Sequence, residues 1–471
     1  MDARSPPEIL TEYQFPPHAF QVQKLTSAML ATNPRGYVLN DLGTGKTRAV
    51  LFAYDYLRIK GDAGKLLVIC PLTAMTRTWA REIMSEFPWL KFKILHGSKA
   101  QRIKNLSVDV DVYIINHDGL ETIFEELVNR KDIWTVCADE LGVYRNGRSN
   151  LTTYFKQYVQ YKKNVWGLTG SPCPKAVTDV WGPCSCITPH TVPRYFGTFR
   201  AQLMTKVDQF RWVARPGAEE RAVSCMQPSV RFRLDEVTEL PQRVMNYYEA
   251  TLSSNQKVVY DGMRKQAAVL VGENKIDALN AGAVLSKLLQ IALGYVYTRE
   301  GKIVELDNTP RLQLILDLID NSYKKAILFA PFKSAISAFD KLLTKNKVDH
   351  GIVTGDISVP KRNTIFSEFQ DTSQLKVLLA HPGCMSHSLT LTAATSVIWA
   401  GPVTSLDTFY QANGRIYRIG QRHKTLIAMV GGTPIERKIY KLLGNNESVQ
   451  ERFLSLVEQL TNDNIEAYSE E

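Results

Sequence analysis

The stretch GYVLNDLGTGKT, residues 36–47, decides the fold expected of this chain. It opens on a short apolar run typical of a buried strand, and the helix-like RAVLFAYDYL follows it directly. Between the two, Gly43 and Gly45 allow the backbone to wrap around a phosphate with its amide groups pointing inward. Lys46 is then placed to reach the terminal phosphates, and the Thr47 hydroxyl to ligate Mg²⁺. The stretch predicts a nucleotide-binding loop between a strand and a helix.

One position of this loop departs from the GxxxxGK[ST] pattern, because Asn40 stands where the first glycine is expected. Thr44 lies inside the same turn and counts among the expected nucleotide-binding residues. The alternative is an ordinary glycine-rich turn that ends in a surface lysine. The intact GKT, with a strand before it and a helix after it, favours the nucleotide-binding loop.

Short apolar runs separated by longer helix-like stretches continue along the chain, and such runs predict buried parallel strands. They are GYVLN (36–40), KLLVICP (65–71), VDVYIIN (110–116), WTVCADE (134–140), VWGLTGS (165–171), KKAILFA (324–330), DHGIVTG (349–355), KVLLAHP (376–382), SVIWAG (396–401) and LIAMVGG (426–432). Between about 245 and 320 the strand signal gives way to helical periodicity. We therefore expect an α/β protein with two parallel-sheet lobes, 1–228 and 229–471, and a helical insertion at about 245–320.

Composition is that of a soluble globular protein, with 44% hydrophobic and 22% charged residues among 471. The chain is long enough for two or three domains, and no apolar run approaches the length of a membrane span. Seven cysteines without regular spacing favour a reducing compartment over a disulfide framework. The formal charge of +10 favours an anionic partner such as nucleic acid. No secretory signal is visible, so we expect a cytoplasmic protein.

Two carboxylates close the run WTVCADE. Asp139 and Glu140 at the end of an apolar strand suit coordination of Mg²⁺ by the first and activation of water by the second. On its own such a pair is more often a solvated strand end or a helix cap. Its occurrence together with the glycine-rich loop favours a nucleotide-hydrolysing site.

The stretch QANGRIYRIGQ, residues 411–421, carries two arginines, two glutamines and two glycines. Arg415 and Arg418 lie three residues apart, a spacing that on a helix places both guanidinium groups on one face. Two guanidinium groups suit a polyphosphate, where they would stabilise charge on the γ-phosphoryl group once the lobes close. The alternative is a solvated basic helix.

The ordered set NDLGTGKT, ADELGVYRN, LTGSP and QANGRIYRIGQ resembles the SWI2/SNF2 branch of the superfamily 2 helicase-like ATPases. This resemblance implies two RecA-like lobes, a DNA-dependent ATPase or helicase activity, and the use of ATP with Mg²⁺. PPHAFQVQ resembles the family's glutamine motif, which implies that Gln21 reads adenine, and Gln411 opens the motif that completes the nucleotide site. Gly142 departs from the family, which usually has histidine there. A compact motor of this kind resembles the bacterial or viral members, so we expect the cytoplasm of a bacterium or of a virus-infected host cell.

The resemblance also implies that both lobes contact the phosphates of DNA, independently of sequence. The residues expected to do so follow strands of either lobe: Thr73, Arg77, Trp79, Asn116, His117, Lys333 and Thr354. Each of them taken alone is as well explained as ordinary surface.

The function expected is an ATP-dependent DNA translocase or helicase that remodels branched or duplex DNA in replication, recombination or repair. An RNA helicase is one alternative, disfavoured by the opening glutamine of 411–421. An ATP-gated clamp that binds DNA and recruits partners without moving is the other.

Overall fold

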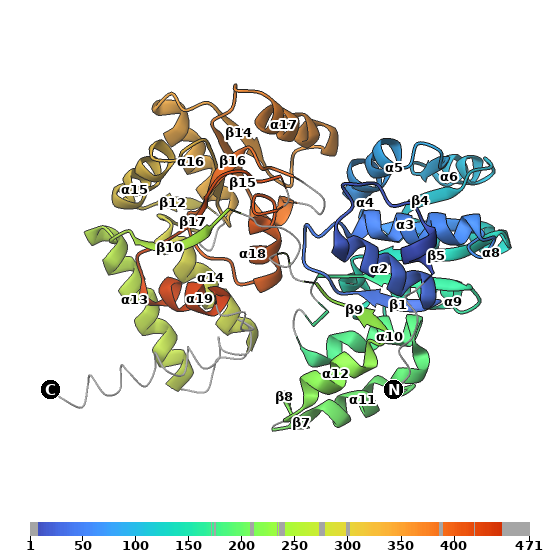
Figure 1. The fold of residues 1–471 in the computed structure, drawn as a ribbon. Helices are drawn as coiled ribbons and strands as arrows, with labels where there is room; N and C mark the ends of the chain where they lie inside the picture. The colour runs from blue at the N-terminus through green and yellow to red at the C-terminus, as the bar shows by residue number, and fades with distance from the viewer. Residues whose placement is uncertain are drawn as a thin grey trace. The chain divides into compact units, whose positions relative to one another are not determined.

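The structure is a computed structural model that describes residues 8–170, 172–173, 176–207, 212–232, 234, 241–272, 278–297, 302–385, 390–418 and 420–444. Internal contacts divide the chain into two compact units, Met1–Glu239 and Leu240–Glu471. Each unit is built on its own parallel sheet, with helices packed on the sheet faces (Figure 1).

The sheet of the first unit has seven strands in the order β3-β4-β2-β5-β6-β1-β9, and all neighbouring pairs are parallel. Its strands are β1 (Arg35–Val38), β2 (Lys65–Cys70), β3 (Phe92–Leu95), β4 (Val112–Asn116), β5 (Ile133–Asp139), β6 (Asn164–Leu168) and β9 (Ser229–Val230). The five strands predicted in the first half are confirmed. The two edge strands, β3 and β9, were not predicted, and β9 lies just where the sequence predicts the second lobe to begin.

Helices cover both faces of this sheet because successive side chains of each strand point to opposite sides. One core lies under α1 (Ile9–Glu12), α2 (Gln21–Thr32), α3 (Lys46–Ile59), α4 (Leu72–Ala74), the π-helical turn η1 (Met75–Ala80) and α5 (Arg81–Glu86). The other lies under α6 (Lys99–Leu106), α7 (His117–Thr122), α8 (Phe124–Asn129), η2 (Leu141–Tyr144), α9 (Asn150–Val159), η3 (Val177–Val180), α10 (Trp181–Ile187), α11 (Phe196–Leu203) and α12 (Ala218–Cys225). The short η4 (Pro189–Thr191) and the antiparallel pair β7 (Met204–Lys206) and β8 (Trp212–Ala214) complete the unit.

The sheet of the second unit has six strands in the order β10-β17-β16-β13-β15-β14, again all parallel. Its strands are β10 (Arg243–Glu249), β13 (Lys325–Phe329), β14 (His350–Val353), β15 (Val377–Ala380), β16 (Ala394–Trp399) and β17 (Thr425–Gly431). The five strands predicted in the second half are confirmed, and the two parallel sheets confirm the predicted α/β class.

Helices also cover both faces of the second sheet. α15 (Thr309–Asp320) and α16 (Lys333–Lys345) pack on one face. The other face carries α13 (Ser254–Gly272), α14 (Ala278–Ala292), α17 (Val359–Asp371), η6 (Pro382–Cys384), α18 (Leu406–Asn413) and α19 (Pro434–Gly444). The stretch 245–320, predicted to lack strands, contains most of β10 and the antiparallel pair β11 (Tyr295–Tyr297) and β12 (Ile303–Glu305). That part of the prediction was wrong, because β10 alternates exposed and half-buried residues at a sheet edge instead of forming an apolar run.

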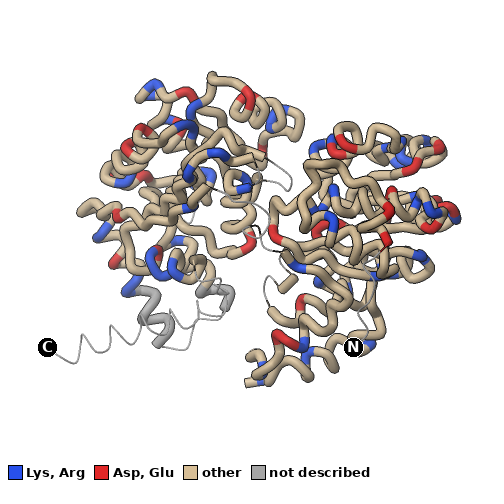
Figure 2. Tube along the Cα trace, viewed as in Figure 1, with Lys and Arg blue, Asp and Glu red and all other residues tan. Residues whose placement is uncertain are grey.

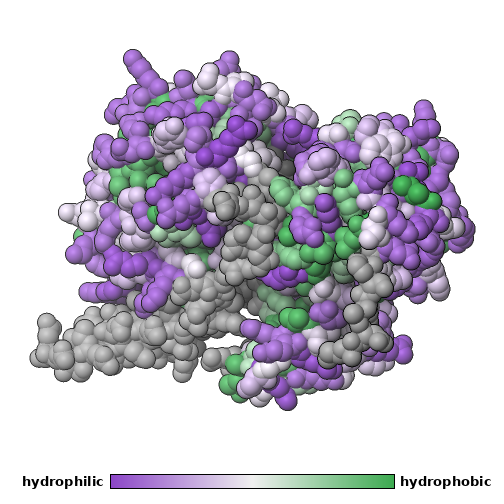
Figure 3. Space-filling view, in the orientation of Figure 1, coloured by the Kyte–Doolittle hydropathy of each residue, from purple (hydrophilic) through white to green (hydrophobic). Residues whose placement is uncertain are grey.

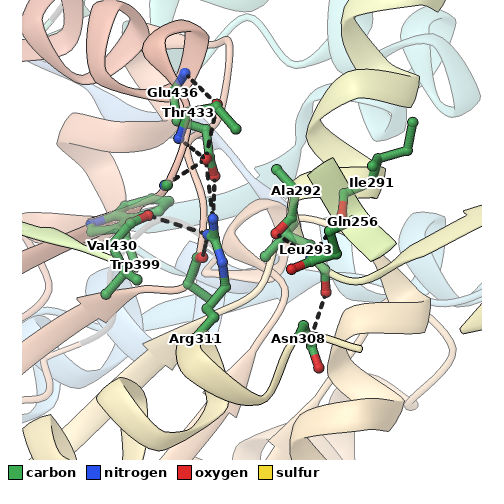
Figure 4. Close-up of polar contacts among 12 residues, drawn as sticks. Gln256, Ile291, Ala292, Leu293, Asn308, Arg311, Trp399, Val430, Thr433 and Glu436 are labelled. Atoms are coloured by element: carbon green, nitrogen blue, oxygen red, sulfur yellow. Dashed lines mark hydrogen bonds and ion pairs between the residues drawn. The ribbon is translucent and has the colours of Figure 1, made fainter. Parts of the chain in front are cut away.

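A buried ion pair holds the second unit together. The guanidinium of Arg311 on α15 lies 3.0 Å from the carboxylate of Glu436 on α19, and both side chains are almost wholly buried. Arg311 also donates to the carbonyl of Ala400, and Glu436 accepts from the backbone amides of Gly432 and Thr433 (Figure 4). Since each charge is both paired and hydrogen bonded, the pair fixes α15 and α19 against the ends of β16 and β17.

Charged residues are spread over both units. Lysine, arginine, aspartate and glutamate are interspersed over the helices of each unit (Figure 2), and the face drawn in Figure 3 is mostly hydrophilic with local apolar patches. In the described part of the chain, no helix combines the length and the apolar composition needed to cross a bilayer.

Candidate functional site

The glycine-rich loop follows β1 at the carboxyl end of the first sheet, the edge where open α/β sheets bind ligands. Gly43 and Gly45 have φ angles of 88° and 80°, which only glycine adopts readily. Gly45 caps the amino end of α3, so the amides of the first turn face the loop. The Lys46 ammonium lies within the loop and donates to the carbonyls of Asn40, at 2.8 Å, and Asp41, at 3.0 Å.

This loop fits a polyphosphate. The positive end of α3 and the backbone amides attract an anion, and the Lys46 ammonium adds a positive charge in the same loop. The φ of 80° at Gly45 strains any other residue, so the cradle depends on glycine there, and the side-chain amide of Gln23 fills the space next to it. The Thr44 hydroxyl donates to the Asp41 carbonyl at 2.9 Å and stabilises the turn. Thr47, the predicted Mg²⁺ ligand, lies in the first turn of α3.

Two glutamines precede the loop on α2, and only one of them contacts it. Gln23 is buried against Gly45, and its side-chain oxygen accepts from the Phe20 amide at 3.0 Å. Gln21, expected to read adenine, is exposed at the start of the helix. Sequence reasoning missed Gln23, although the repeated glutamine in FQVQ was visible.

Asn40 has a structural reason to replace the glycine of the pattern. Its buried side-chain amide donates to the Thr26 hydroxyl on α2 at 3.0 Å, and its side-chain oxygen accepts from the Phe232 amide at 2.9 Å. Glycine would leave both partners without these bonds. The residue therefore ties the loop to α2 and to the stretch that follows β9.

The predicted carboxylates lie at the end of β5. The Asp139 carboxylate accepts a hydrogen bond from the indole of Trp79 at 3.1 Å. Glu140 has a φ of 65°, a conformation that is unfavourable for a residue with a side chain and often marks a functional site. In the sheet, β6 lies between β5 and β1, so the carboxylates and the loop do not follow neighbouring strands. The loop and the carboxylates still share the carboxyl edge of one sheet.

Gly142 follows the carboxylates in η2. A Cβ at this position would meet no atom within 4 Å, so the absence of the family's histidine leaves open space. The buried His117, on the neighbouring α7, instead contacts Tyr144 of η2, with 2.8 Å between its Nδ1 and the phenol oxygen. Burial raises the pKa of Tyr144 well above its ordinary value.

The residues predicted to contact DNA from the first unit divide into two groups. Thr73 and Arg77 are partly exposed, and burial together with nearby Arg81 lowers the pKa of Arg77. Trp79 is fully buried. A buried indole offers no surface to DNA, so the contact with Asp139 replaces the predicted role of Trp79.

The other predicted pair, Asn116 and His117, is also buried. The side-chain oxygen of Asn116 accepts from the Arg102 guanidinium at 2.9 Å, and burial lowers the pKa of Arg102. Both side chains are therefore occupied in packing the end of β4 against α6 and η2, and we do not carry them forward as DNA contacts.

In the second unit the motif 411–421 begins on α18, and Gly414 ends that helix before either arginine. The predicted helical face is therefore wrong: Arg415 and Arg418 lie on the irregular turn that follows. Arg415 is 2% exposed, and burial lowers the pKa of Arg418. Ile419 and, in the LTGSP motif, Ser171 lie outside the described residues.

Several polar residues of this motif have structural contacts that explain their presence. Gln411 donates to Asp407 one turn earlier, at 3.0 Å. The Asn413 side chain accepts from the buried indole of Trp399 at 3.0 Å. Gln421 donates to the Ala394 carbonyl at 2.9 Å and accepts from the amide of Arg422. The two ends of the motif are thus anchored to β16, which fixes the turn that carries the arginines.

The last predicted DNA contacts lie at the carboxyl end of the second sheet. Lys333 begins α16 after β13, and its exposed ammonium pairs with Asp356 at 2.8 Å, which raises the pKa of Lys333. Thr354 follows β14 and is partly exposed in the same loop as Asp356. The structure therefore brings Lys333 and Thr354 to neighbouring loops.

Comparison with known proteins gives two family models that match this chain. The model of the SNF2-related domain matches residues 23–295, and that of the helicase conserved C-terminal domain matches residues 310–420. A solved structure, the SWI2/SNF2 ATPase core of Sulfolobus solfataricus in complex with dsDNA, is 19% identical, with a TM-score of 0.45 over 91% of both chains.

Curated relatives are distant in sequence. An uncharacterized ATP-dependent helicase of Mycoplasma genitalium is 24% identical over 90% of this chain and 39% of its own length. The p41 protein of Acyrthosiphon pisum secondary endosymbiont phage 1 is 24% identical over 76% of this chain and 79% of its own. The SWI/SNF-related matrix-associated actin-dependent regulator of chromatin subfamily A-like protein 1 of Drosophila melanogaster is 24% identical over 89% of this chain and 54% of its own length. The chain thus spans about two fifths to four fifths of these relatives.

Proposed function

We propose that this chain, which belongs to the SNF2-related family as its motifs predict, is an ATP-driven motor that moves on DNA. The observation that carries the proposal is the glycine-rich loop of Lys46, at the carboxyl edge of the same sheet that presents Asp139 and Glu140. The SNF2-related model covers the loop and the two carboxylates, the helicase C-terminal model covers Arg415 and Arg418, and a helicase is among the relatives.

In this proposal the first unit binds ATP and Mg²⁺. The amides between Gly43 and Thr47 hold the phosphates, and Lys46 exchanges the Asn40 and Asp41 carbonyls for phosphate oxygens. Thr47 and Asp139 would hold Mg²⁺, which would supply positive charge to offset the charge that develops on the transferred phosphoryl group. Glu140 orients the attacking water, and Gln21 reads the adenine.

The second unit supplies Arg415 and Arg418, together with Gln411, to complete the site when the two units close. Positive charge placed on the γ-phosphoryl group at that moment makes hydrolysis depend on closure. The turn that carries both arginines is anchored at Asn413 and Gln421, so the guanidinium groups come from a fixed frame.

The DNA contacts that we propose are the exposed or partly exposed ones: Thr73 and Arg77 in the first unit, Lys333 and Thr354 in the second. Because each unit carries such contacts at the carboxyl edge of its sheet, closure and reopening of the two units would move one set of DNA contacts relative to the other. Phosphate contacts make this binding sequence-independent and dependent on salt. We further propose that branched or duplex DNA in replication, recombination or repair is the substrate.

The test is the rate of ATP hydrolysis at one fixed salt concentration, without nucleic acid and with single-stranded DNA, duplex DNA, a four-way junction or single-stranded RNA. Stimulation by duplex or junction supports the proposal. Stimulation by RNA alone would replace it with an RNA helicase. Stimulation without displacement of a triplex-forming strand from duplex would favour the clamp.

A matched pair of variants shows which site is responsible. Lys46→Ala is expected to abolish the stimulated hydrolysis. Lys60→Ala removes an exposed lysine just beyond the other end of α3, which pairs with Glu12, and should leave the rate unchanged. Retained DNA-stimulated hydrolysis in Lys46→Ala would contradict the assignment of the site.

A further inference from the structure

The stretch that leaves the first sheet runs alongside the glycine-rich loop. We call Ser229 to Phe232 together with Leu234 the exit segment, because the chain passes from it to the second unit, which begins at Leu240. Its backbone pairs with β1: the carbonyl of Val230 accepts from Leu39, at 2.8 Å, and that of Phe232 from Asp41, at 3.0 Å. The pairing therefore continues past β1 into the loop itself.

Side chains of the loop extend this pairing. The Asn40 side chain accepts from the Phe232 amide at 2.9 Å, and the Asp41 carboxylate accepts from the Leu234 amide at 3.2 Å. The other carboxylate oxygen of Asp41 lies 3.2 Å from the Arg231 guanidinium, which also donates to the Leu39 carbonyl at 2.9 Å. Two consecutive loop residues thus hold the exit segment through their side chains.

The same two residues hold the loop's lysine through their backbones. Lys46 donates to the carbonyls of Asn40 and Asp41, at 2.8 and 3.0 Å. A phosphate in the loop competes for the Lys46 ammonium. When the ammonium moves to the phosphate, the carbonyls of Asn40 and Asp41 lose this cation, and the side chains of the same two residues bond the exit segment. Asn40 is the residue at which this chain departs from the glycine of the loop pattern, and glycine has no side chain to make the grip.

We propose that Asn40 and Asp41 form a latch that reports nucleotide binding to the connection between the units. With the loop empty, Lys46 fixes both peptides and the latch holds Phe232 and Leu234. With nucleotide bound, Lys46 turns to the phosphates and the latch loosens. This inference rests on the proposed function, since it needs a nucleotide in the loop, and it assigns Asn40 and Asp41 a positioning role and no part in the chemistry.

The test is hydrogen exchange of the Phe232 and Leu234 amides in the full chain, with and without the analogue AMP-PNP and Mg²⁺. Binding of a fluorescent ATP analogue is measured in parallel. We expect exchange of both amides to become roughly fivefold faster when the loop is occupied, the size expected for one weakened hydrogen bond. Unchanged or slower exchange with nucleotide bound overturns the latch and leaves the proposed function standing. Absence of nucleotide binding overturns both.

Variants distinguish a latch from general loosening. In the Asn40→Ala variant, the Phe232 amide should exchange fast without nucleotide, and its exchange rate should not change when AMP-PNP binds. Asn40→Asp keeps an oxygen for the Phe232 amide and should restore the nucleotide response. Asn33→Ala is the matched control, because Asn33 bonds Met29 at the opposite end of β1. If Asn40→Ala does not fold, the response of the unmodified chain still decides the proposal.

Discussion

The indole Nε1 of Trp79 lies 3.1 Å from the carboxylate of Asp139 and donates a hydrogen bond to it. Trp79 belongs to the π-helical turn η1 after β2, and Asp139 ends the neighbouring β5. A wholly buried donor thus orients the carboxylate to which we assign Mg²⁺. Trp79, predicted to contact DNA, therefore supports a residue of the proposed nucleotide site.

We therefore predict that Trp79→Phe weakens the use of Mg²⁺ while the fold is kept. Phenylalanine fills most of the buried space but donates no hydrogen bond, and a bond to a charged group is worth about 1.5–3 kcal/mol. The Mg²⁺ concentration that gives half-maximal ATP hydrolysis should rise roughly tenfold. Trp89→Phe is the matched control, because Trp89 donates in the same way to Asp55, a residue of α3 outside the site. Equal effects of both variants would contradict the role of Trp79.

Gly142→His is expected to be tolerated. A Cβ at this position meets no atom within 4 Å, and the position does not have the positive φ that requires glycine. The free energy of unfolding should change by no more than about 0.5 kcal/mol, as at other open surface positions. Urea unfolding measures it. A much larger loss would show that the site is constrained by something other than the space around it.

Glu436→Gln should destabilise the second unit strongly. It removes one partner of a buried ion pair and leaves the Arg311 charge uncompensated, which typically costs about 3–5 kcal/mol. Glu249→Gln provides the control, since its pair with Arg437 is exposed on both sides and water screens it, so this variant should change the free energy of unfolding far less. Chemical unfolding followed by probes in each unit measures both variants. A small effect of Glu436→Gln would mean that the pair contributes little.

The free energy of unfolding should depend on pH through Lys162. Burial lowers the pKa of Lys162 from 10.5 to about 8, because the half-buried ammonium is partly removed from water. Between about 8 and 10.5 the unfolded chain therefore binds more protons than the folded one, so this lysine makes stability rise with pH across that window. Below it the lysine contributes a constant penalty. Comparison of urea midpoints at several pH values should show that Lys162→Met lacks this rise, whereas Lys163→Met, which changes an exposed lysine, keeps it.

The interior of both sheets could be predicted from the sequence because buried parallel strands are continuous apolar runs. The strands that were missed lie at sheet edges. FKIL in β3 is short and mostly half-buried, and β10 mixes polar and aromatic residues, so neither produces such a run. An edge strand is defined by its single neighbour, which a local pattern does not contain.

The candidate site divides in the same way. The loop of Lys46 is one continuous stretch of sequence, and so is the Asp139–Glu140 pair, so each could be recognised from the sequence alone. The contacts of Gln23 with Gly45 and of Asn40 with Phe232 join residues far apart in the chain, and only the fold reveals them. The helix ending at Gly414 was a local signal that could have been used, because glycine commonly ends helices.

The buried pair of Arg311 and Glu436 also has an evolutionary consequence. Two apolar residues of similar size would remove both buried charges, a replacement that is often neutral or stabilising, but here they would also leave the Ala400 carbonyl and the Gly432 and Thr433 amides without these partners. A lineage reaches that state only through an intermediate with one charge stranded in the core. Either single substitution destabilises the unit, so the ion pair is expected to persist in evolution even where a double substitution would be tolerated.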